Sequence, residues 1–200
     1  MSGAPPAPQH PEAGTTMHHK LRRIAHLFLT LTLAAGLAAP AGAAAETRDP
    51  AGFFNDTFGD FTEELALARE EGKEGILLFF EMDECPFCHR MKQMVLNQAR
   101  VQDWFQERFL VFSVDTEGDT EITDFQGRTM PSKDFAFKVN RVRATPVFAF
   151  YDLEGEQVVR YTGATKDAGE LLLLGEFVVG DHYKDTNFMR FKREHRSEAP

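Results

Sequence analysis

The sequence is poor in cysteine, and this shortage excludes a fold held together by disulfides. Its 200 residues include only two cysteines, Cys85 and Cys88, which stand three positions apart. The loop-entropy model gives so small a disulfide ring about 2 kcal/mol, against about 3 kcal/mol for a 15-residue loop. A protein that relied on disulfides for stability would place them elsewhere. We therefore expect the two cysteines to serve a chemical purpose.

Basic residues are also in the minority, with 22 against 31 acidic residues and a formal net charge of −9. Without residues 1–45 the chain keeps 19 basic and 30 acidic residues, a net charge of −11. An acidic domain without a basic patch is a poor nucleic-acid binder. We expect no nucleic-acid partner.

Residues 1–45 are expected to lie outside the folded domain. From Met17 the sequence runs through a basic stretch, an apolar stretch and small residues (MHHKLRR, IAHLFLTLTLAAGLAAP, AGAAAE), the layout of a secretory signal peptide. The alternative is a retained membrane anchor, because about 20 apolar residues span a bilayer. His26, Pro40 and the alanines that follow favour cleavage near Ala43 to Ala45. We expect a start at Met17, export to the periplasm and no stable membrane insertion after cleavage.

Four short apolar runs predict the strands of a sheet. Residues 75–81 and 109–115 are continuous apolar runs without helical spacing, as in strands buried on both faces. Residues 145–152 and 156–163 flank a short turn and predict a hairpin. The polar stretch 116–132 between these pairs is interpreted as an insertion with one hairpin.

Helical spacing of apolar residues predicts helices between these strands. Strands that alternate with helices and end in a hairpin imply an α/β fold, with a mixed central sheet of about four strands and helices on both faces. We place this domain at 46–185 and expect residues 186–200 to form a polar, flexible tail. The helix expected over 53–72 rests on Phe54, Phe58, Phe61 and Leu65, the helix after the cysteines on Met91, Met94, Val95 and Gln98, and the closing helix over 166–180 on Leu171, Leu174 and Val178.

The motif Cys-Pro-Phe-Cys-His at 85–89 fits two chemistries. Cys-x-x-Cys at a helix start is a thiol–disulfide motif, whereas Cys-x-x-Cys-His also attaches c-type haem. Haem would need His89 and a second axial ligand, for which Met130 and Met189 are available. A haem domain of this size is usually helical, while this chain has at least four strand-like runs. A haem- or copper-handling binding protein remains the alternative.

A structural zinc site is not expected. The two cysteines and His89 supply three ligands, and structural zinc takes four. The other histidines of the expected mature chain, His182 and His195, lie near the C-terminus and are interpreted as solvated. We expect no metal ligands.

Two separated motifs together resemble the thioredoxin superfamily. The first is Cys-x-x-Cys between a strand and its helix, and the second is Thr145-Pro146 opening a strand (RATPVFAF) about 60 residues later. The segments LLFFEMDECPFCHRMK, EITDFQGRTM and LLLLGEFVV further resemble the SoxW-type periplasmic thioredoxins, a group associated with bacterial sulfur-compound oxidation. The resemblance implies a thioredoxin-like fold, an exported thiol–disulfide oxidoreductase and a cis Pro146 beside the disulfide. It implies no cofactor beyond that disulfide.

The position of the cysteines assigns their roles. Attack on a disulfide needs a thiolate, and unpaired N–H groups at a helix N-terminus stabilise one. Cys85 stands at that position and is expected to be the nucleophile, with Cys88 as the resolving thiol. Pro86 and Phe87 are expected to hold the turn and cover it with apolar surface. Thr145 and Pro146 would offer a backbone edge to substrate, and the partners would be protein thiols and disulfides together with a membrane thiol electron donor.

The sequence departs from the thioredoxin pattern beside the cysteines. Thioredoxins carry a buried Asp six residues before the first cysteine and a Trp four before it, where this chain has Phe79 and Glu81. The usual proton-transfer group is therefore missing, and Glu81 is a weak candidate to replace it. Because of this departure, the residues leave the direction of electron flow open.

Overall fold

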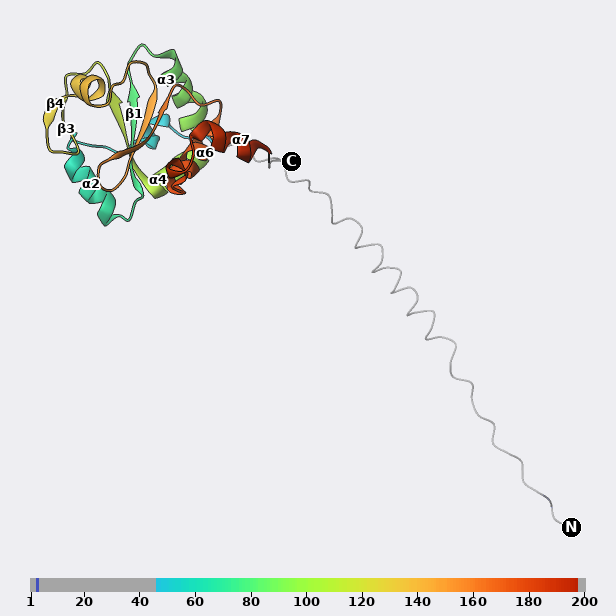
Figure 1. Cartoon of the computed structure of the whole chain (residues 1–200). Helices are drawn as coiled ribbons and strands as arrows, with labels where there is room; N and C mark the ends of the chain where they lie inside the picture. Colours follow the sequence, from blue (N-terminus) through green and yellow to red (C-terminus); the bar gives the residue numbers. More distant parts are fainter. Residues whose placement is uncertain (1–2, 4–45, 198–200) are drawn as a thin grey trace. The chain divides into compact units, whose positions relative to one another are not determined.

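The structure, a computed structural model, describes residue 3 and residues 46–197 (Figure 1). The expected signal segment, with its start at Met17 and its cleavage near residues 43–45, falls almost entirely outside the described residues. Within the part of the chain that is described, no helix has the length and apolar character needed to cross a membrane.

The centre of the domain is a four-stranded mixed sheet, as the sequence predicts. Its strands lie in the order β2-β1-β5-β6. Strand β1 is parallel to β2 and antiparallel to β5, and β5 and β6 form the predicted hairpin. Because β1 and β5 are central, their side chains are buried on both faces, apart from Glu81 at the end of β1. The bounds are β1 Gly75–Glu81, β2 Phe109–Asp115, β5 Val147–Tyr151 and β6 Gln157–Thr162.

Helices cover both faces of this sheet (Figure 1). One face carries the cysteine helix α3, its π-helical continuation η2, and α4, α6 and α7, while the other carries α2, the small β3–β4 hairpin, α5 and η3. The hairpin lies in the predicted insertion. The bounds are η1 Pro50–Phe53, α2 Phe61–Glu70, α3 Pro86–Met91, η2 Lys92–Leu96, α4 Ala99–Arg108, β3 Glu121–Thr123, β4 Thr129–Pro131, α5 Ser132–Asp134, η3 Phe135–Val139, α6 Ala168–Val179, η4 His182–Lys184 and α7 Phe188–Ser197.

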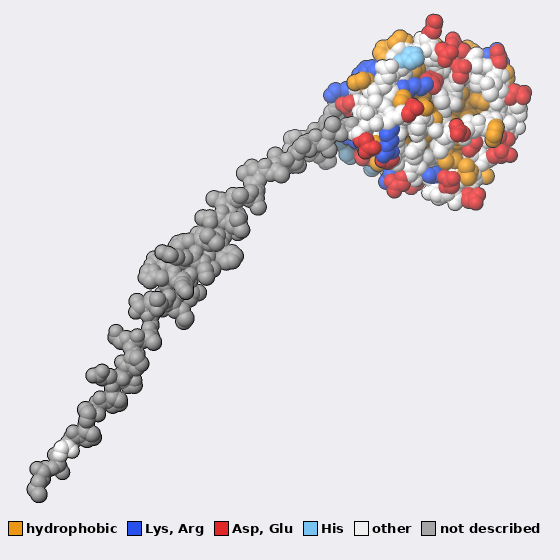
Figure 2. All heavy atoms as spheres, turned by 180° about the vertical axis from the view of Figure 1, so that it is seen from behind, with side chains coloured by type: hydrophobic (Ala, Val, Ile, Leu, Met, Phe, Trp, Pro, Cys, Tyr) orange, Lys and Arg blue, Asp and Glu red, His pale blue; other side chains and the backbone are white. Residues whose placement is uncertain are grey.

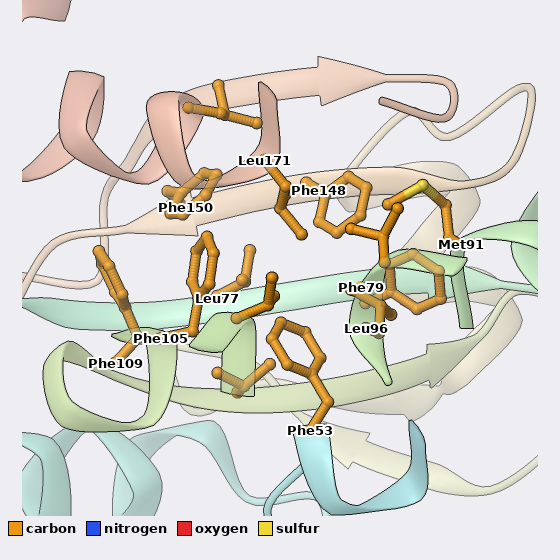
Figure 3. Close-up of a cluster of buried hydrophobic side chains, with 14 of the residues drawn as sticks. Phe53, Leu77, Phe79, Met91, Leu96, Phe105, Phe109, Phe148, Phe150 and Leu171 are labelled. Carbon is orange, nitrogen blue, oxygen red and sulfur yellow. The ribbon is translucent and has the colours of Figure 1, made fainter. Parts of the chain in front are cut away.

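Phenylalanine fills the core on the cysteine side of the sheet. Phe53, Phe105 and Phe109 pack with Leu77 of β1 in the same cluster that contains both cysteines (Figure 3). The rings meet edge-on or tilted, with centroids of Phe53 and Phe105 5.6 Å apart. Such pairs add to the burial of apolar area. The cysteine helix therefore packs on an aromatic floor, the layer formed by these phenylalanine side chains.

The helix predicted over 53–72 is wrong in its first half. The chain forms η1, then an irregular segment, and α2 begins only at Phe61. Asp60 caps it, since the Asp60 Oδ1 accepts the backbone N–H groups of Thr62 at 2.9 Å and Glu63 at 3.2 Å. Gly59 has φ of +87°, which interrupts any helix through this point. Phe58 is consequently fully exposed (104%) rather than on a buried face.

The apolar stripe predicted after the cysteines is also only partly right. Met91 and Val95 are buried, but Met94 is 63% exposed. The helix widens to a π-helix from Lys92, and the wider turn breaks the 3.6-residue spacing on which the prediction rested.

The expected flexible tail is instead helix α7 as far as residue 197. Phe188 and Phe191, three positions apart, place one apolar edge of this basic helix against the core on the cysteine side. Lys192 forms an ion pair with Glu170 of α6, with Nζ 2.5 Å from Oε1 and both side chains largely buried. The sequence looks polar because only that edge is apolar.

Candidate active site

Cys85 lies directly before α3, a few residues after the end of β1, and Cys88 lies in the first turn of α3. They form a disulfide, and Cys85 is the N-cap of α3. The backbone N–H of Cys88 donates to the Sγ of Cys85 at 3.0 Å. Pro86 takes the first helical position, where a missing N–H costs nothing. The local sequence therefore places the first sulfur at the positive end of the helical segment.

Both sulfurs are nearly covered, while the residues between them are open. Cys85 is 4% exposed and Cys88 1%, so the first cysteine is the more accessible one. Phe87 is 59% exposed, and Pro86 is exposed beside it. The disulfide thus sits below an apolar surface that a partner protein can cover.

The position that holds an acid in thioredoxins is part of the aromatic core. Phe79 is fully buried in the cluster that also contains Met91 and Leu96 (Figure 3). Its ring centroid lies 4.9 Å from that of Phe148 and 5.7 Å from that of Phe54. The floor beneath the cysteines is therefore apolar at this point.

Glu81 lies further along the same face of β1 and is held by two partners. Lys92 Nζ is 2.7 Å from one carboxylate oxygen, and the Ser113 hydroxyl donates to the other at 2.6 Å. The Glu81 side chain is only 15% exposed. An ion pair with a hydrogen-bonded serine thus occupies the place of the tryptophan in thioredoxins.

Sequence reasoning missed both partners of Glu81. Lys92 stands four residues after Cys88, a helical spacing that puts it on the same face, and this signal was available. Ser113 is brought to Glu81 by the parallel pairing of β1 with β2, in which Phe79 lies opposite Ser113. That register is a tertiary property.

The second predicted element of the site, Thr145-Pro146, precedes β5 at the same edge of the sheet. The Thr145–Pro146 bond is cis. Val147 pairs with Phe80 of β1, so these two residues lie near the end of the strand that leads to Cys85. Thr145 and Met82 line one groove, with a cavity volume of about 230 Å³. The fold therefore brings both predicted motifs to one edge.

A polar network anchors the loop that leads to Thr145. Asn140 accepts hydrogen bonds on its side chain from the hydroxyl of Tyr151 and from Gln157 Nε2, the latter at 3.2 Å, while the guanidinium of Arg160 donates to its backbone carbonyl. Burial raises the pKa of Tyr151 to about 12, although hydrogen bonds with Gln157 and Asn140 oppose the rise. The loop is thus held by hydrogen bonds that centre on two buried residues, Asn140 and Tyr151.

His89 contacts the backbone of the segment before the cysteines. It is exposed, and its Nε2 lies 2.9 Å from the backbone carbonyl oxygen of Asp83. Among the described residues, no group of three or more His, Cys, Asp or Glu side chains is arranged to hold a metal ion.

Comparison with known proteins agrees with this geometry. A family described as "Thioredoxin-like domain" matches residues 61–178, so the chain belongs to the thioredoxin-like domain family. Among curated proteins, none matches this chain in sequence.

Solved structures that are similar to this chain include the following three. A thioredoxin-fold protein from Helicobacter pylori has a TM-score of 0.55 at 18% identity, over 74% of this chain and 90% of that one. A protein from Bacteroides thetaiotaomicron named as a candidate disulphide-isomerase has a TM-score of 0.50 at 26% identity, over 68% and 97%. The DsbH oxidoreductase has a TM-score of 0.48 at 18% identity, over 70% and 95%.

The fold is therefore a mixed α/β thioredoxin-like fold with a Cys85–Cys88 disulfide at the end of its central strand. This arrangement is consistent with a thiol–disulfide oxidoreductase.

Proposed function

We propose that the protein is an exported thiol–disulfide oxidoreductase that exchanges electrons with protein partners through Cys85 and Cys88. The observation that carries the proposal is the placement of Cys85. Its Sγ caps the first turn of α3 and accepts the N–H of Cys88. Backbone donors at that position favour a thiolate over a thiol.

The exchange runs in two steps. The Cys85 thiolate attacks one sulfur of a partner disulfide, forms a mixed disulfide and releases the other partner sulfur as a thiolate. Cys88 then loses its proton and attacks Cys85, which re-forms the Cys85–Cys88 disulfide and frees the second partner sulfur. Two electrons pass from the protein to the partner, and the two released thiolates take up two protons.

Thr145 and Pro146, with Pro86 and Phe87, form the surface for the partner. Thr145 is half-buried at the groove that also contains Met82, and regular strand pairing of β5 begins two residues later, at Val147. A partner segment lying here meets the backbone of Thr145 on one side and the exposed Phe87 on the other. Extended segments bind other proteins by forming hydrogen bonds with exposed backbone of this kind.

Glu81 takes part in proton transfer to and from Cys88. This role is supported by its place on the cysteine face of β1 and by its contacts with Lys92 and Ser113, which fix the carboxylate. Lys92 lies one helical turn after Cys88, so the pair adjoins the helix that carries the resolving thiol.

The SoxW-like segments of the sequence favour a reductase in sulfur-compound oxidation. Export separates a reductase from cytosolic reductants, so this role needs electrons from a membrane thiol carrier. The residues that direct export precede residue 46, and the mature protein is expected to begin near Ala43 to Ala45.

Insulin reduction tests the central claim. Reduced wild-type protein should cleave the insulin disulfides, and Cys85→Ser should abolish this activity. Cys88→Ser should stop turnover while trapping a mixed disulfide with the partner. Full activity in Cys85→Ser would overturn the assignment of the nucleophile.

The reduction potential tests the direction of electron flow. A reductase should have a Cys85–Cys88 potential near that of thioredoxin, about −270 mV, whereas a value near that of DsbA, about −120 mV, would contradict a reductase. Absorbance in the haem Soret region and metal analysis of the purified protein examine the alternative. Stoichiometric haem or copper would overturn the proposal.

A further inference from the structure

The groove beside Thr145 contains a positioned arginine that the exchange chemistry does not use. The groove is lined by Met82, Thr116, Ala136, Phe137, Arg143 and Thr145, among others. Met82 and Ala136 provide apolar walls, and Phe137 is an exposed aromatic ring. The groove therefore offers apolar contact together with a cation, next to the place where a partner segment would lie.

Arg143 is held in one orientation by three contacts. Its guanidinium carbon lies 3.6 Å from the centroid of the Phe137 ring. Its Nη1 donates to the backbone carbonyls of Phe137 at 2.9 Å and Val142 at 3.0 Å. These contacts occupy one face and one nitrogen of the guanidinium, which leaves Nε and Nη2 for a ligand. A side chain fixed in advance loses little conformational freedom when it binds.

The loop around Arg143 is locally basic in an acidic domain. Arg141 and Arg160 lie on or against the same loop, and Arg160 donates to the backbone carbonyls of Asn140 and Arg141. Within the described part of the chain, none of these three arginines forms an ion pair with a carboxylate. Figure 2, by contrast, shows acidic side chains scattered over the face of the domain drawn there.

One acid, Glu117, also lines the groove. It is exposed, and its backbone N–H donates to Asp115 Oδ1 at 2.9 Å. Arg143 is exposed as well, so water screens both charges. The attraction of Arg143 is the stronger, because the bound anion contacts its guanidinium directly.

We propose that this groove selects partner proteins that carry an acidic side chain beside the cysteine attacked by Cys85. The carboxylate pairs with the guanidinium of Arg143, and its methylene groups contact Phe137 and the apolar walls. Charge-assisted hydrogen bonds of an arginine with a carboxylate are among the stronger polar contacts in proteins. This inference rests on the proposed function, since it names the class of partner that the same site accepts.

The test measures the attack of Cys85 on activated peptides. In the Cys88→Ser background, Cys85 attacks the peptide sulfur of a peptidyl 2-thiopyridyl disulfide, forms a Cys85–peptide disulfide and releases thiopyridone, which is followed by absorbance. The peptides carry Glu, Gln or Lys in turn at each of the three positions on either side of their cysteine. The neutral reagent 4,4′-dithiodipyridine reports the reactivity of Cys85 alone.

We expect at least one position at which Glu reacts faster than Lys by about threefold to tenfold, with Gln between them. Arg143→Gln should remove this preference, and Arg143→Lys should keep part of it. Arg193→Gln is the matched control, because Arg193 is an exposed arginine on α7 and its loss changes the net charge equally. The preference should also decline with added salt.

Three results would overturn the inference. They are equal rates for Glu and Lys peptides at every position, an unchanged preference in Arg143→Gln, and an equal loss of preference in Arg193→Gln. Failure of the proposed function is a separate outcome, because Cys85 would then react slowly with 4,4′-dithiodipyridine as well. A far-UV circular dichroism spectrum that matches the Cys88→Ser parent shows that the Arg143→Gln variant is folded.

Discussion

The site is built from two segments, the one that contains the cysteines and the loop that ends at Thr145. Different interactions hold them in place. The cysteine segment rests on apolar packing, because Cys85 and Cys88 belong to the same buried cluster as Phe79 and Phe148. The loop that ends at Thr145 rests on hydrogen bonds that centre on the buried Asn140 and Tyr151. Apolar packing is insensitive to pH, whereas a buried phenol responds to it. The packing of the cysteine segment should therefore persist at pH values that weaken the hydrogen bonds of the loop before Thr145.

The same contrast explains where the ion pair of Glu81 lies. Glu81 is at the last position of β1, where burial gives way to partial exposure. There Lys92 and Ser113 bind the carboxylate. Deeper in the strand, the side chain of Phe79 packs against the rings of Phe54 and Phe148. A carboxylate would be costly at the Phe79 position and is well accommodated at the Glu81 position.

The largest effect on stability should come from placing an acidic side chain in the apolar core beneath the cysteine segment. Phe79→Asp should lower the free energy of unfolding by more than about 3 kcal/mol, because it removes a buried ring and desolvates a carboxyl group. Urea denaturation at neutral pH measures this change.

Phe79→Leu is the matched control for that variant, and it should cost about 1 kcal/mol because it keeps an apolar side chain of similar size. Equal stability of the Asp and Leu variants would mean that the cysteine segment does not depend on an apolar floor. The contrast between the two segments would then be wrong.

A smaller effect on stability is expected at high pH from Tyr151, in the polar network of the loop before Thr145. The pKa of Tyr151 is raised above its ordinary value of 10.0 to about 12 by burial, so the folded state favours the neutral phenol. This preference stabilises the fold fully below about pH 10 and is lost as the pH rises to about 12. On the order of 2 kcal/mol of stability should disappear over that interval.

Tyr151→Phe isolates this contribution. The variant should lose about 1 kcal/mol at neutral pH, because the hydroxyl no longer donates to Asn140 or accepts from Gln157. It should also show a weaker decline of stability between about pH 10 and 12. Tyr183→Phe, at a half-buried tyrosine on η4, is the control and should keep most of the decline. An identical alkaline decline in wild type and Tyr151→Phe would contradict the assignment.

The smallest effect on stability should come from Glu81→Gln. Its ion pair is partly exposed, so we expect a change below about 1 kcal/mol. The rate at which Cys88 resolves a mixed disulfide should nevertheless fall by about threefold to tenfold, with an altered pH profile, if Glu81 moves the proton of Cys88.

Asp134→Asn provides the comparison for Glu81→Gln. Asp134 also forms an ion pair with a lysine, Lys138, but on α5 and η3 rather than on the cysteine face. Its loss should leave the resolving rate and the pH profile unchanged. A similar change in both variants would mean that Glu81 does not transfer the proton of Cys88.

Much of the fold was predictable because its signals are local. Continuous apolar runs marked β1 and β2, and the turn before residue 156 marked the hairpin of β5 and β6. The thiol motif was likewise legible, since Cys85 and Pro86 specify a helix start by themselves. These features depend on side chains that are neighbours in the sequence.

The errors arose where distant contacts decide. Phe58 continued a helical pattern, yet the backbone of Gly59 is hydrogen-bonded to Thr123 of β3 and the helix begins only after Asp60. The C-terminal segment looked too polar to order, yet Phe188 and Phe191 bury one edge of α7. Neither outcome is encoded in the spacing alone, because each depends on what the rest of the chain places opposite.

By itself, the sequence determined the class of fold, the cysteine pair and the element that presents it. Only the tertiary structure decided what surrounds the pair: the hydrogen bond of Ser113 with Glu81, the network that anchors the loop before Thr145, and Arg143 over Phe137. Helix starts and buried strands follow from residues close in the chain. The electrostatic environment of a site follows from strand register and loop packing, which join residues that are far apart in it.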